Sequence, residues 1–297
     1  MFIFVIFHIL SSLLFNVVSL SAFDNYGETQ KVWQLNNFSE KVEKINNLDL
    51  SASSVAVLDS DANFFLFERE ANEVRSIASI SKVMAALVFM DLDINFEDYY
   101  RIQASDRRLG GRDYLFLGEE VKKIDLLALS LIPSDNTAVI ALSNSIGLSE
   151  DDLVKKMNEK AKELKLYKTY FEDATGLSNN NVSTAKEVAI MTAKAFENEL
   201  IADLAQRYAY NFETKNGRIK NVNSTNELLV GFKDLEVDGR VISGKTGYNI
   251  LAGYCLTLKF SNSDGKEFIS VVLNSKSIKD RFRDSEKIIA EVAEIYK

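Results

Sequence analysis

The sequence predicts an α+β fold in which an antiparallel sheet of five strands is flanked by helices and carries an all-helical insertion. Three observations predict this fold. Two strand patterns come early, over residues 52–58 and 64–68, and three more come late in the chain, before a final helix. The stretch between them, from about residue 92 to 200, is mostly helical in pattern. The helical block is therefore expected to interrupt a single sheet.

The first 22 residues predict a signal peptide or an N-terminal membrane anchor. Residues 2–22 are nearly all apolar, and no charged side chain appears before Asp24. The small residues Ser19 to Ala22 favour cleavage by a signal peptidase, whereas the long apolar run without a preceding Lys or Arg favours retention. Either outcome exports the rest of the chain to the periplasm or the outer face of the cytoplasmic membrane. Cleavage is the favoured alternative.

A polar tether over residues 23–30 and a first helix over 31–47 follow the leader. The helix is predicted from apolar residues at helical spacing, namely Val32, Leu35, Phe38, Val42 and Ile45. The strands over 52–58 and 64–68 flank the polar turn 59–63, so they predict a β-hairpin.

The remaining elements complete the predicted domain, which spans residues 31–297. A helix opens at Ser79 and runs to about Asp91. The other predicted helices cover residues 121–132, 135–146, 149–164, 184–198 and 283–296. The late strands cover residues 240–245, 251–260 and 267–273.

Composition excludes several functional classes. The 297 residues carry a net charge of −8, and the pI is about 5.0, which argues against nucleic acid as a partner. The only histidine is His8, in the apolar leader, so the folded part has no Ser-His-Asp triad and no histidine-based zinc site. The single cysteine, Cys255, excludes an intrachain disulfide and is interpreted as a small buried hydrophobe. We expect no metal and no organic cofactor.

Three short motifs occur in one order and together predict an acyl-transfer site. They are Ser79-Ile80-Ser81-Lys82, Ser134-Asp135-Asn136 and Lys245-Thr246-Gly247. Residues at i and i+3 share a helix face, so an amine lies beside the Ser79 hydroxyl and can activate it. With no histidine available, Lys82 must be the base. Burial and the Lys245 cation would both lower its pKa.

The second and third motifs add groups that handle a substrate amide. Ser134 and Asn136 offer a hydroxyl and an amide that can relay protons and hold the substrate. Lys245 adds positive charge, and Gly247 is expected to let a substrate backbone lie close to its strand.

The ordered motifs resemble those of the penicillin-recognising serine enzymes, which comprise DD-peptidases and serine β-lactamases. The segments Arg75 to Met84, Leu131 to Ala138 and Gly244 to Tyr248 look like the three boxes of low-molecular-weight D-Ala-D-Ala peptidases. Lesser signatures are Gly176-Leu177, Ser183-Thr184-Ala185 and Ser224 to Leu229, and the resemblance runs from about residue 50 to the C-terminus. It implies a β-lactamase/DD-peptidase-like fold, in agreement with the pattern of elements.

The resemblance also implies a role for each site residue. Ser79 is the nucleophile, Lys82 its base and Ser134 the proton relay to the leaving amine, whereas Asn136 binds the substrate amide. The backbone N–H groups of Ser79 and Tyr248 form the oxyanion hole. The substrate carboxylate is held by Lys245, Thr246 and Arg281, with Arg283 as the alternative arginine.

The expected function is that of an exported serine D-Ala-D-Ala carboxypeptidase or DD-endopeptidase acting on peptidoglycan stem peptides. β-Lactam antibiotics are the expected covalent inhibitors, and the N-terminal segment, if it is not cleaved, attaches the protein to the membrane. A class A β-lactamase would need a deacylating glutamate in a Glu-x-x-Leu-Asn string, which the sequence lacks. A non-catalytic peptidoglycan-binding relative is the other alternative, although its Ser-x-x-Lys motif would normally be broken.

Overall fold

The computed structural model describes residues 44–231 and 238–296. The predicted leader over 1–22, the tether over 23–30 and most of the predicted helix over 31–47 lie outside these residues. Within the described residues, no helix combines the length and the apolar content that crossing a bilayer requires.

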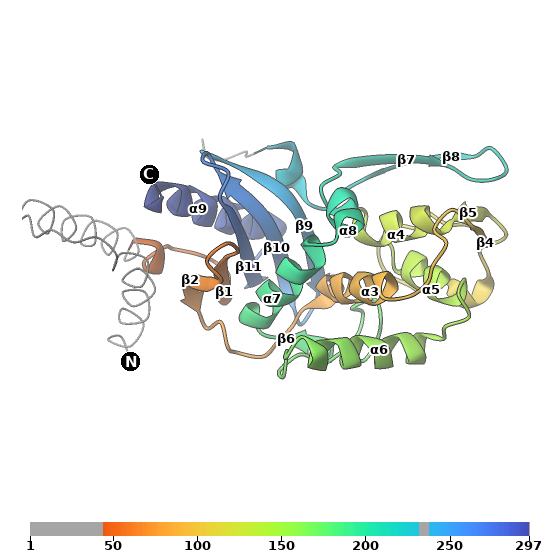
Figure 1. Ribbon diagram of the computed structural model, residues 1–297, viewed down its shortest axis with the longest axis horizontal. Coiled ribbons are helices and arrows are strands. Elements are labelled where there is room, and N and C mark those ends of the chain that lie inside the picture. Colours follow the sequence, from red (N-terminus) through yellow and green to blue (C-terminus); the bar gives the residue numbers. More distant parts are fainter. Residues whose placement is uncertain (1–43, 232–237, 297) are drawn as a thin grey trace, which may run out of the picture. The chain divides into compact units, whose positions relative to one another are not determined.

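A five-stranded antiparallel sheet forms the centre of the fold, as the sequence predicts (Figure 1). Its strands lie in the order β2-β1-β11-β10-β9. All neighbouring pairs are antiparallel, and in the middle of the sheet Ser54 of β1 faces Leu273 of β11. The strands are β1 (Ser54–Asp59), β2 (Phe64–Arg69), β9 (Gly239–Asn249), β10 (Gly253–Asn262) and β11 (Glu267–Ser275).

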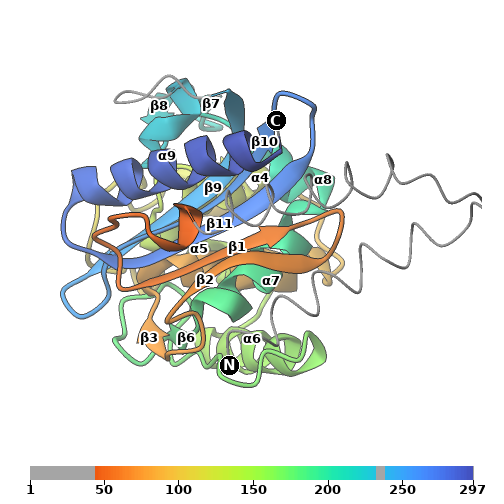
Figure 2. The same cartoon turned by 90° about the vertical axis from the view of Figure 1, so that its left-hand side faces the viewer.

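Helices cover both faces of this sheet. The C-terminal helix α9 (Ile278–Ile295) lies on one face and α7 (Ala185–Phe196) on the other (Figures 1 and 2), and α3 (Ser81–Met90) packs against α7. This double cover explains why all six residues of β1 are buried. The strand reads as a continuous apolar run and not as an alternating one.

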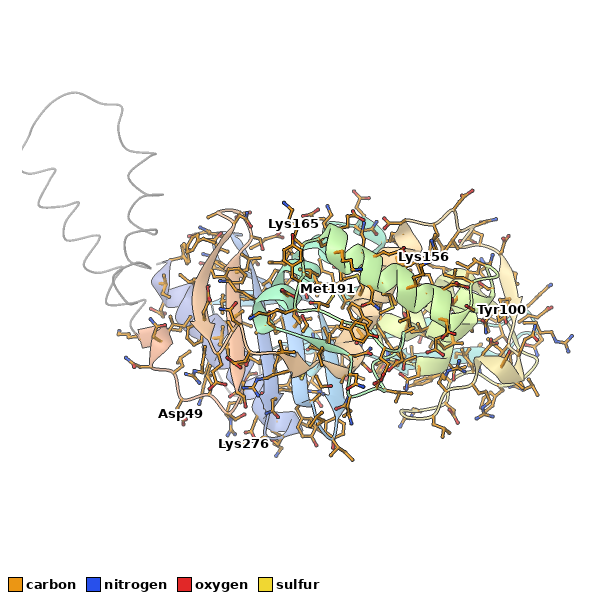
Figure 3. The ribbon with its side chains drawn as sticks, turned by 90° about the horizontal axis from the view of Figure 1, so that it is seen from below. Asp49, Tyr100, Lys156, Lys165, Met191 and Lys276 are labelled. Carbon is orange, nitrogen blue, oxygen red and sulfur yellow. The ribbon has the colours of Figure 1, made fainter. Side chains whose placement is uncertain are left out.

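The helical insertion extends from the sheet on the side of β9. It contains α4 (Lys123–Leu131), α5 (Asn136–Asn144), α6 (Glu150–Glu163) and α8 (Glu199–Ala205). Figure 3 shows α6, marked by Lys156 with Lys165 just beyond its end, and places Tyr100 at the end far from the sheet. Ser149 and Thr184 cap α6 and α7 by accepting the backbone N–H of Asp152 and Glu187.

Short elements that the sequence did not predict lie within the insertion and beside it. Three two-stranded ladders pair residues that are distant or weakly patterned. They are β3 (Arg75–Ser76) with β6 (Val182–Ser183), β4 (Tyr99–Arg101) with β5 (Glu120–Lys122), and β7 (Ala209–Glu213) with β8 (Ile219–Asn223). Three 3₁₀ turns are η1 (Ala78–Ile80), η2 (Ala104–Asp106) and η3 (Glu227–Val230).

The last helix begins five residues earlier than predicted. Its first residue is Ile278, because Ser277 accepts the N–H of Asp280 and caps the helix before the apolar pattern becomes regular. The carboxylate of Asp284 fixes this end of α9 by accepting the N–H of Ser51 and Ala52 and the hydroxyl of Ser275. The first turns of α9 are therefore held against the sheet.

Candidate active site

The sequence predicted that Ser79 opens an α-helix. In the structure Ser79 lies instead in the 3₁₀ turn η1, just before the α-helix. The α-helix begins at Ser81, whose hydroxyl donates to the carbonyl of Ala78 at 2.7 Å. Ala78 has a φ of +46°, an unfavourable conformation for a residue with a Cβ. Backbone strain of this kind persists where surrounding contacts enforce it.

Two glycines from distant segments enforce the turn. A Cβ on Gly176 would lie 2.0 Å from the Ala78 carbonyl oxygen, and a Cβ on Gly247 would lie 2.6 Å from that of Ile77. Both segments therefore pack against the backbone around Ser79. For Gly247 the close neighbour is this turn of the protein itself, and the approach of a substrate backbone stays a prediction.

Lys82 is completely buried and has three polar neighbours. Its Nζ lies 2.9 Å from Ser79 Oγ, 2.7 Å from Asn136 Oδ1 and 2.6 Å from the carbonyl oxygen of Thr175. The two carbonyl oxygens can only accept hydrogen bonds, so they bind the two hydrogens of a neutral amine. The nitrogen lone pair then faces the Ser79 hydroxyl.

The environment of Lys82 lowers its pKa to about 7. Burial is the largest cause, because the charged ammonium loses its hydration. The carboxylates of Asp135 and Asp173 oppose this effect and raise the pKa. From the sequence we expected burial and Lys245 to lower the pKa, and burial is the dominant cause in the structure.

A second serine–lysine pair joins the other two motifs. Lys245 Nζ donates to Ser134 Oγ at 2.7 Å and to the Thr246 carbonyl at 3.0 Å. Burial holds the pKa of Lys245 well below its usual value, and the cations of Lys82 and Arg281 lower it further. Ser134 has a φ of +66° and does not cap α5; Asp135 does, by accepting the N–H of Ala138.

Asn136 bridges Lys82 and a loop of the insertion. Its Oδ1 accepts from Lys82, while its Nδ2 donates to the carbonyl oxygens of Leu109 at 3.0 Å and Gly110 at 3.2 Å. Asn136 itself is buried. The Asn136 oxygen therefore accepts a hydrogen bond from Lys82, and its nitrogen donates to the loop.

The third motif runs along β9 toward the site. The hydroxyl of Thr246 lies 2.5 Å from that of Thr225. Beyond Gly247, Tyr248 is half exposed, and its ring stacks on Tyr254 with 4.4 Å between ring centroids. Thr225 belongs to the minor signature over 224–229, and the structure brings it to the main motif.

The predicted last helix began after Arg281. In the structure Arg281 lies inside the first turn of α9. Its guanidinium is buried, donates to the carbonyl of Gly247 at 3.3 Å and lies 5.8 Å from the ring of Tyr254. Its Nε has no hydrogen-bond partner among the described residues. Burial lowers its pKa to about 10, so it remains a cation at neutral pH. The structure thus brings Arg281 to the third motif.

The segment from Asp173 to Asn181 contributes groups that sequence reasoning missed. Asp173 Oδ1 accepts the N–H groups of Thr175 and Gly176, which presents the Thr175 carbonyl to Lys82. Asn181 donates to Ser81 Oγ at 2.9 Å, and its carbonyl accepts the N–H of Ile77 at 3.0 Å. The Gly176-Leu177 signature was the one signal that pointed to this segment.

Metal and thiol chemistry find no support in the described part of the chain. There, no three His, Cys, Asp or Glu side chains are grouped so that they could hold a metal ion. Cys255 is buried, and burial raises the pKa of its thiol to about 11. A thiol with this pKa is a poor nucleophile near neutral pH.

Comparison with known proteins identifies the family. Residues 40–277 match the family model of D-alanyl-D-alanine carboxypeptidases. The chain is 33% identical over 246 residues to D-alanyl-D-alanine carboxypeptidase DacF of Bacillus subtilis, covering 80% of this chain and 61% of that protein. It is 31% identical to the D-alanyl-D-alanine endopeptidase of Haemophilus influenzae, covering 69% of each chain.

A solved structure supports the same assignment. The crystal structure of the Streptomyces K15 DD-transpeptidase superposes with a TM-score of 0.75 at 26% identity, covering 82% of this chain and 97% of that one. The β-lactamase/DD-peptidase-like fold expected from the motifs is thus confirmed. The match over most of the chain, on a fold that assembles the three motifs, makes this protein a member of the D-alanyl-D-alanine carboxypeptidase family of serine peptidases.

Proposed function

We propose that this protein is a serine-type D-Ala-D-Ala carboxypeptidase or DD-endopeptidase that trims peptidoglycan stem peptides through an acyl-enzyme on Ser79. One observation carries the proposal. The Lys82 amine lies 2.9 Å from Ser79 Oγ, and two carbonyl oxygens hold its hydrogens so that its lone pair faces the hydroxyl. With a pKa of about 7, a large fraction of Lys82 is neutral at physiological pH.

The first half of the reaction transfers the acyl group. Ser79 Oγ attacks the carbonyl carbon of the penultimate D-alanine while its proton moves to Lys82. The oxyanion is bound by the N–H groups of Ser79 and Tyr248; the packing of Gly247 on the Ser79 turn supports this placement. The C–N bond then breaks, and the proton taken up by Lys82 passes through Ser134 to the leaving amine, so Lys82 is neutral again. Ser134 contacts Lys245 at 2.7 Å.

The second half releases the product. Water gives a proton to Lys82 and attacks the ester carbon, and the C–Oγ bond breaks as Ser79 regains a proton. Asn136 donates to the amide carbonyl of the acyl donor throughout. Because an amide nitrogen has two hydrogens, a substrate carbonyl at Nδ2 replaces one of the two loop oxygens that occupy it.

The carboxylate of the leaving D-amino acid binds among Lys245, Thr246 and Arg281. This cluster buries two basic side chains in one place, and the charged form of each binds a carboxylate through charge-assisted hydrogen bonds. A bound carboxylate raises the pKa of Lys245 again and so restores its charge. Among the described residues, Arg281 Nε has no hydrogen-bond partner, so it is available to bind the same carboxylate.

The decisive experiment is covalent labelling by penicillin. A β-lactam imitates the D-Ala-D-Ala amide, so intact-mass analysis should show one added penicillin per chain. The label should be absent from Ser79→Ala, with Ser60→Ala on the far hairpin as a matched control. Labelling that survives in Ser79→Ala would refute the assignment of the nucleophile. Mass spectrometry of products from cross-linked muropeptides distinguishes a carboxypeptidase from an endopeptidase.

We also propose that the protein works outside the cytoplasm and is attached to the membrane when residues 1–22 are retained. The support is the uncharged apolar run over 2–22 together with membership of a family whose substrate is the cell wall. Cell fractionation should find the protein in the periplasmic or the membrane fraction. A full-length cytoplasmic protein would contradict this proposal.

A further inference from the structure

The loop between β4 and β5 contacts Asn136 through its backbone. Leu109 and Gly110 offer two carbonyl oxygens to Asn136 Nδ2, at 3.0 and 3.2 Å. None of the three sequence motifs includes this loop. Its side chain at position 109 points to solvent, with 89% of the leucine exposed, so the contact with the site belongs to the backbone.

These carbonyls select one of the two orientations of the Asn136 amide. In the observed orientation, Oδ1 accepts from Lys82 at 2.7 Å and Nδ2 donates to both loop oxygens. If the amide were turned over, its Nδ2 would face the Lys82 amine, which is also a donor. Its Oδ1 would face the two carbonyl oxygens of the loop, which are also acceptors. The loop therefore keeps an acceptor directed at the base.

The loop is fixed to the helix that carries Asn136. Immediately before Leu109, the N–H of Arg108 donates to Thr137 Oγ1 at 3.2 Å. The Arg108 guanidinium also binds Glu150 of α6 at 2.6 Å, and both side chains of this pair are partly buried. The positions of the two carbonyls are thus set relative to α5.

We propose that the Leu109–Gly110 segment is a positioning element of the active site, which orients Asn136 so that Asn136 in turn orients the Lys82 amine toward Ser79. This inference rests on the proposed function. Gly110 is the sensitive position, because its φ is +93° and an added Cβ would lie 3.3 Å from Asn136 Nδ2 and 3.1 Å from Leu177 Cδ2. The methyl group of an alanine at position 110 would therefore come into close contact with the side-chain amide of Asn136.

The neighbouring glycine provides a matched control. Gly111 has a φ of +83°, and a Cβ added to it would have no atom within 4 Å. Alanine is strained at both positions for the same backbone reason, but only at Gly110 does it meet the site. Gly110→Ala and Gly111→Ala therefore separate an effect on Asn136 from loop strain.

The experiment measures the rate of penicillin acylation against pH for both variants. Gly110→Ala should lower the plateau rate about 10- to 100-fold, as expected for a misplaced catalytic group. Its midpoint should also move to lower pH, because Lys82 loses an acceptor that favours the ammonium form. The charged groups that act with Lys82, namely Asp135, Asp173 and Lys245, are unchanged. Gly111→Ala should keep the wild-type profile.

A double-mutant cycle tests whether Gly110→Ala lowers the acylation rate through Asn136. In an Asn136→Ala background, Gly110→Ala should lower the rate no further, since the amide that it displaces is absent. Equal losses in Gly110→Ala and Gly111→Ala, or an undiminished loss in the Asn136→Ala background, would overturn the inference. A wild-type protein that penicillin does not acylate would instead refute the proposed function. Circular dichroism confirms that each variant is folded.

Discussion

Two buried lysines lie beside serine hydroxyls, and their surroundings give them different chemistry. Lys82 lies 2.9 Å from Ser79 Oγ, and Lys245 lies 2.7 Å from Ser134 Oγ. Burial lowers the pKa of both. Around Lys82, however, the carboxylates of Asp135 and Asp173 oppose the effect, and its pKa is about 7. Around Lys245, two further cations reinforce the effect.

Neighbouring charges, and not burial alone, therefore distinguish the two lysines. A lysine near carboxylates keeps a pKa close to physiological pH, so it can take up and release a proton. A lysine beside Lys82 and Arg281 belongs to a site rich in basic side chains, which the proposed substrate carboxylate would neutralise. The first pair suits proton transfer and the second suits anion binding.

Replacement of Lys82 by arginine should have the largest effect on the rate of acylation. Lys82→Arg keeps a cation but removes the ability to accept a proton near neutral pH. Acylation by penicillin should fall at least about 100-fold, the lower range for loss of a general base. Stopped-flow kinetics measure the rate, and circular dichroism controls for folding. A folded variant that acylates near the wild-type rate would show that another residue is the base.

Replacement of Lys245 by glutamine tests the anion site. Lys245→Gln should lower kcat/KM for a peptide ending in a free D-alanine carboxylate by about 10- to 100-fold, as expected for losing a hydrogen bond to a charged group. The same peptide ending in a carboxamide lacks the anion and should lose much less. Equal losses for the two peptides would mean that Lys245 does not recognise the carboxylate. Steady-state hydrolysis assays provide both values.

The smallest expected effect is a shift of the pH profile in Asp173→Asn. In the wild type, acylation should rise with pH through about 7, because only neutral Lys82 accepts the Ser79 proton. The Asp173 carboxylate raises the pKa of Lys82, so its neutralisation should move the midpoint to lower pH. Asp151→Asn, at an exposed position on α6, is the matched control. A midpoint that stays in place or rises would contradict the assigned effect of Asp173.

The fold class could be predicted from the sequence, and so could the residues of the candidate site. Short apolar runs bounded by turn residues located the five strands, and helical periodicity located helices α4 to α7, each to within a few residues. The three motifs pointed to Ser79, Lys82 and Lys245 through their residue types and their order along the chain. The chemistry of these residues follows from their side-chain groups and from the absence of histidine in the described domain.

The arrangement that holds these residues in place could not be predicted from the sequence. The left-handed Ala78 and the 3₁₀ turn at Ser79 depend on Gly176 and Gly247, which are close in space but about 100 and 170 residues away along the chain. The carbonyls that orient Lys82 and Asn136 belong to segments without periodicity, since any residue type supplies a backbone oxygen. A pKa near 7 likewise requires burial by several elements at once. Local sequence patterns do not encode contacts between segments that are distant along the chain, so these contacts are seen only in the folded structure.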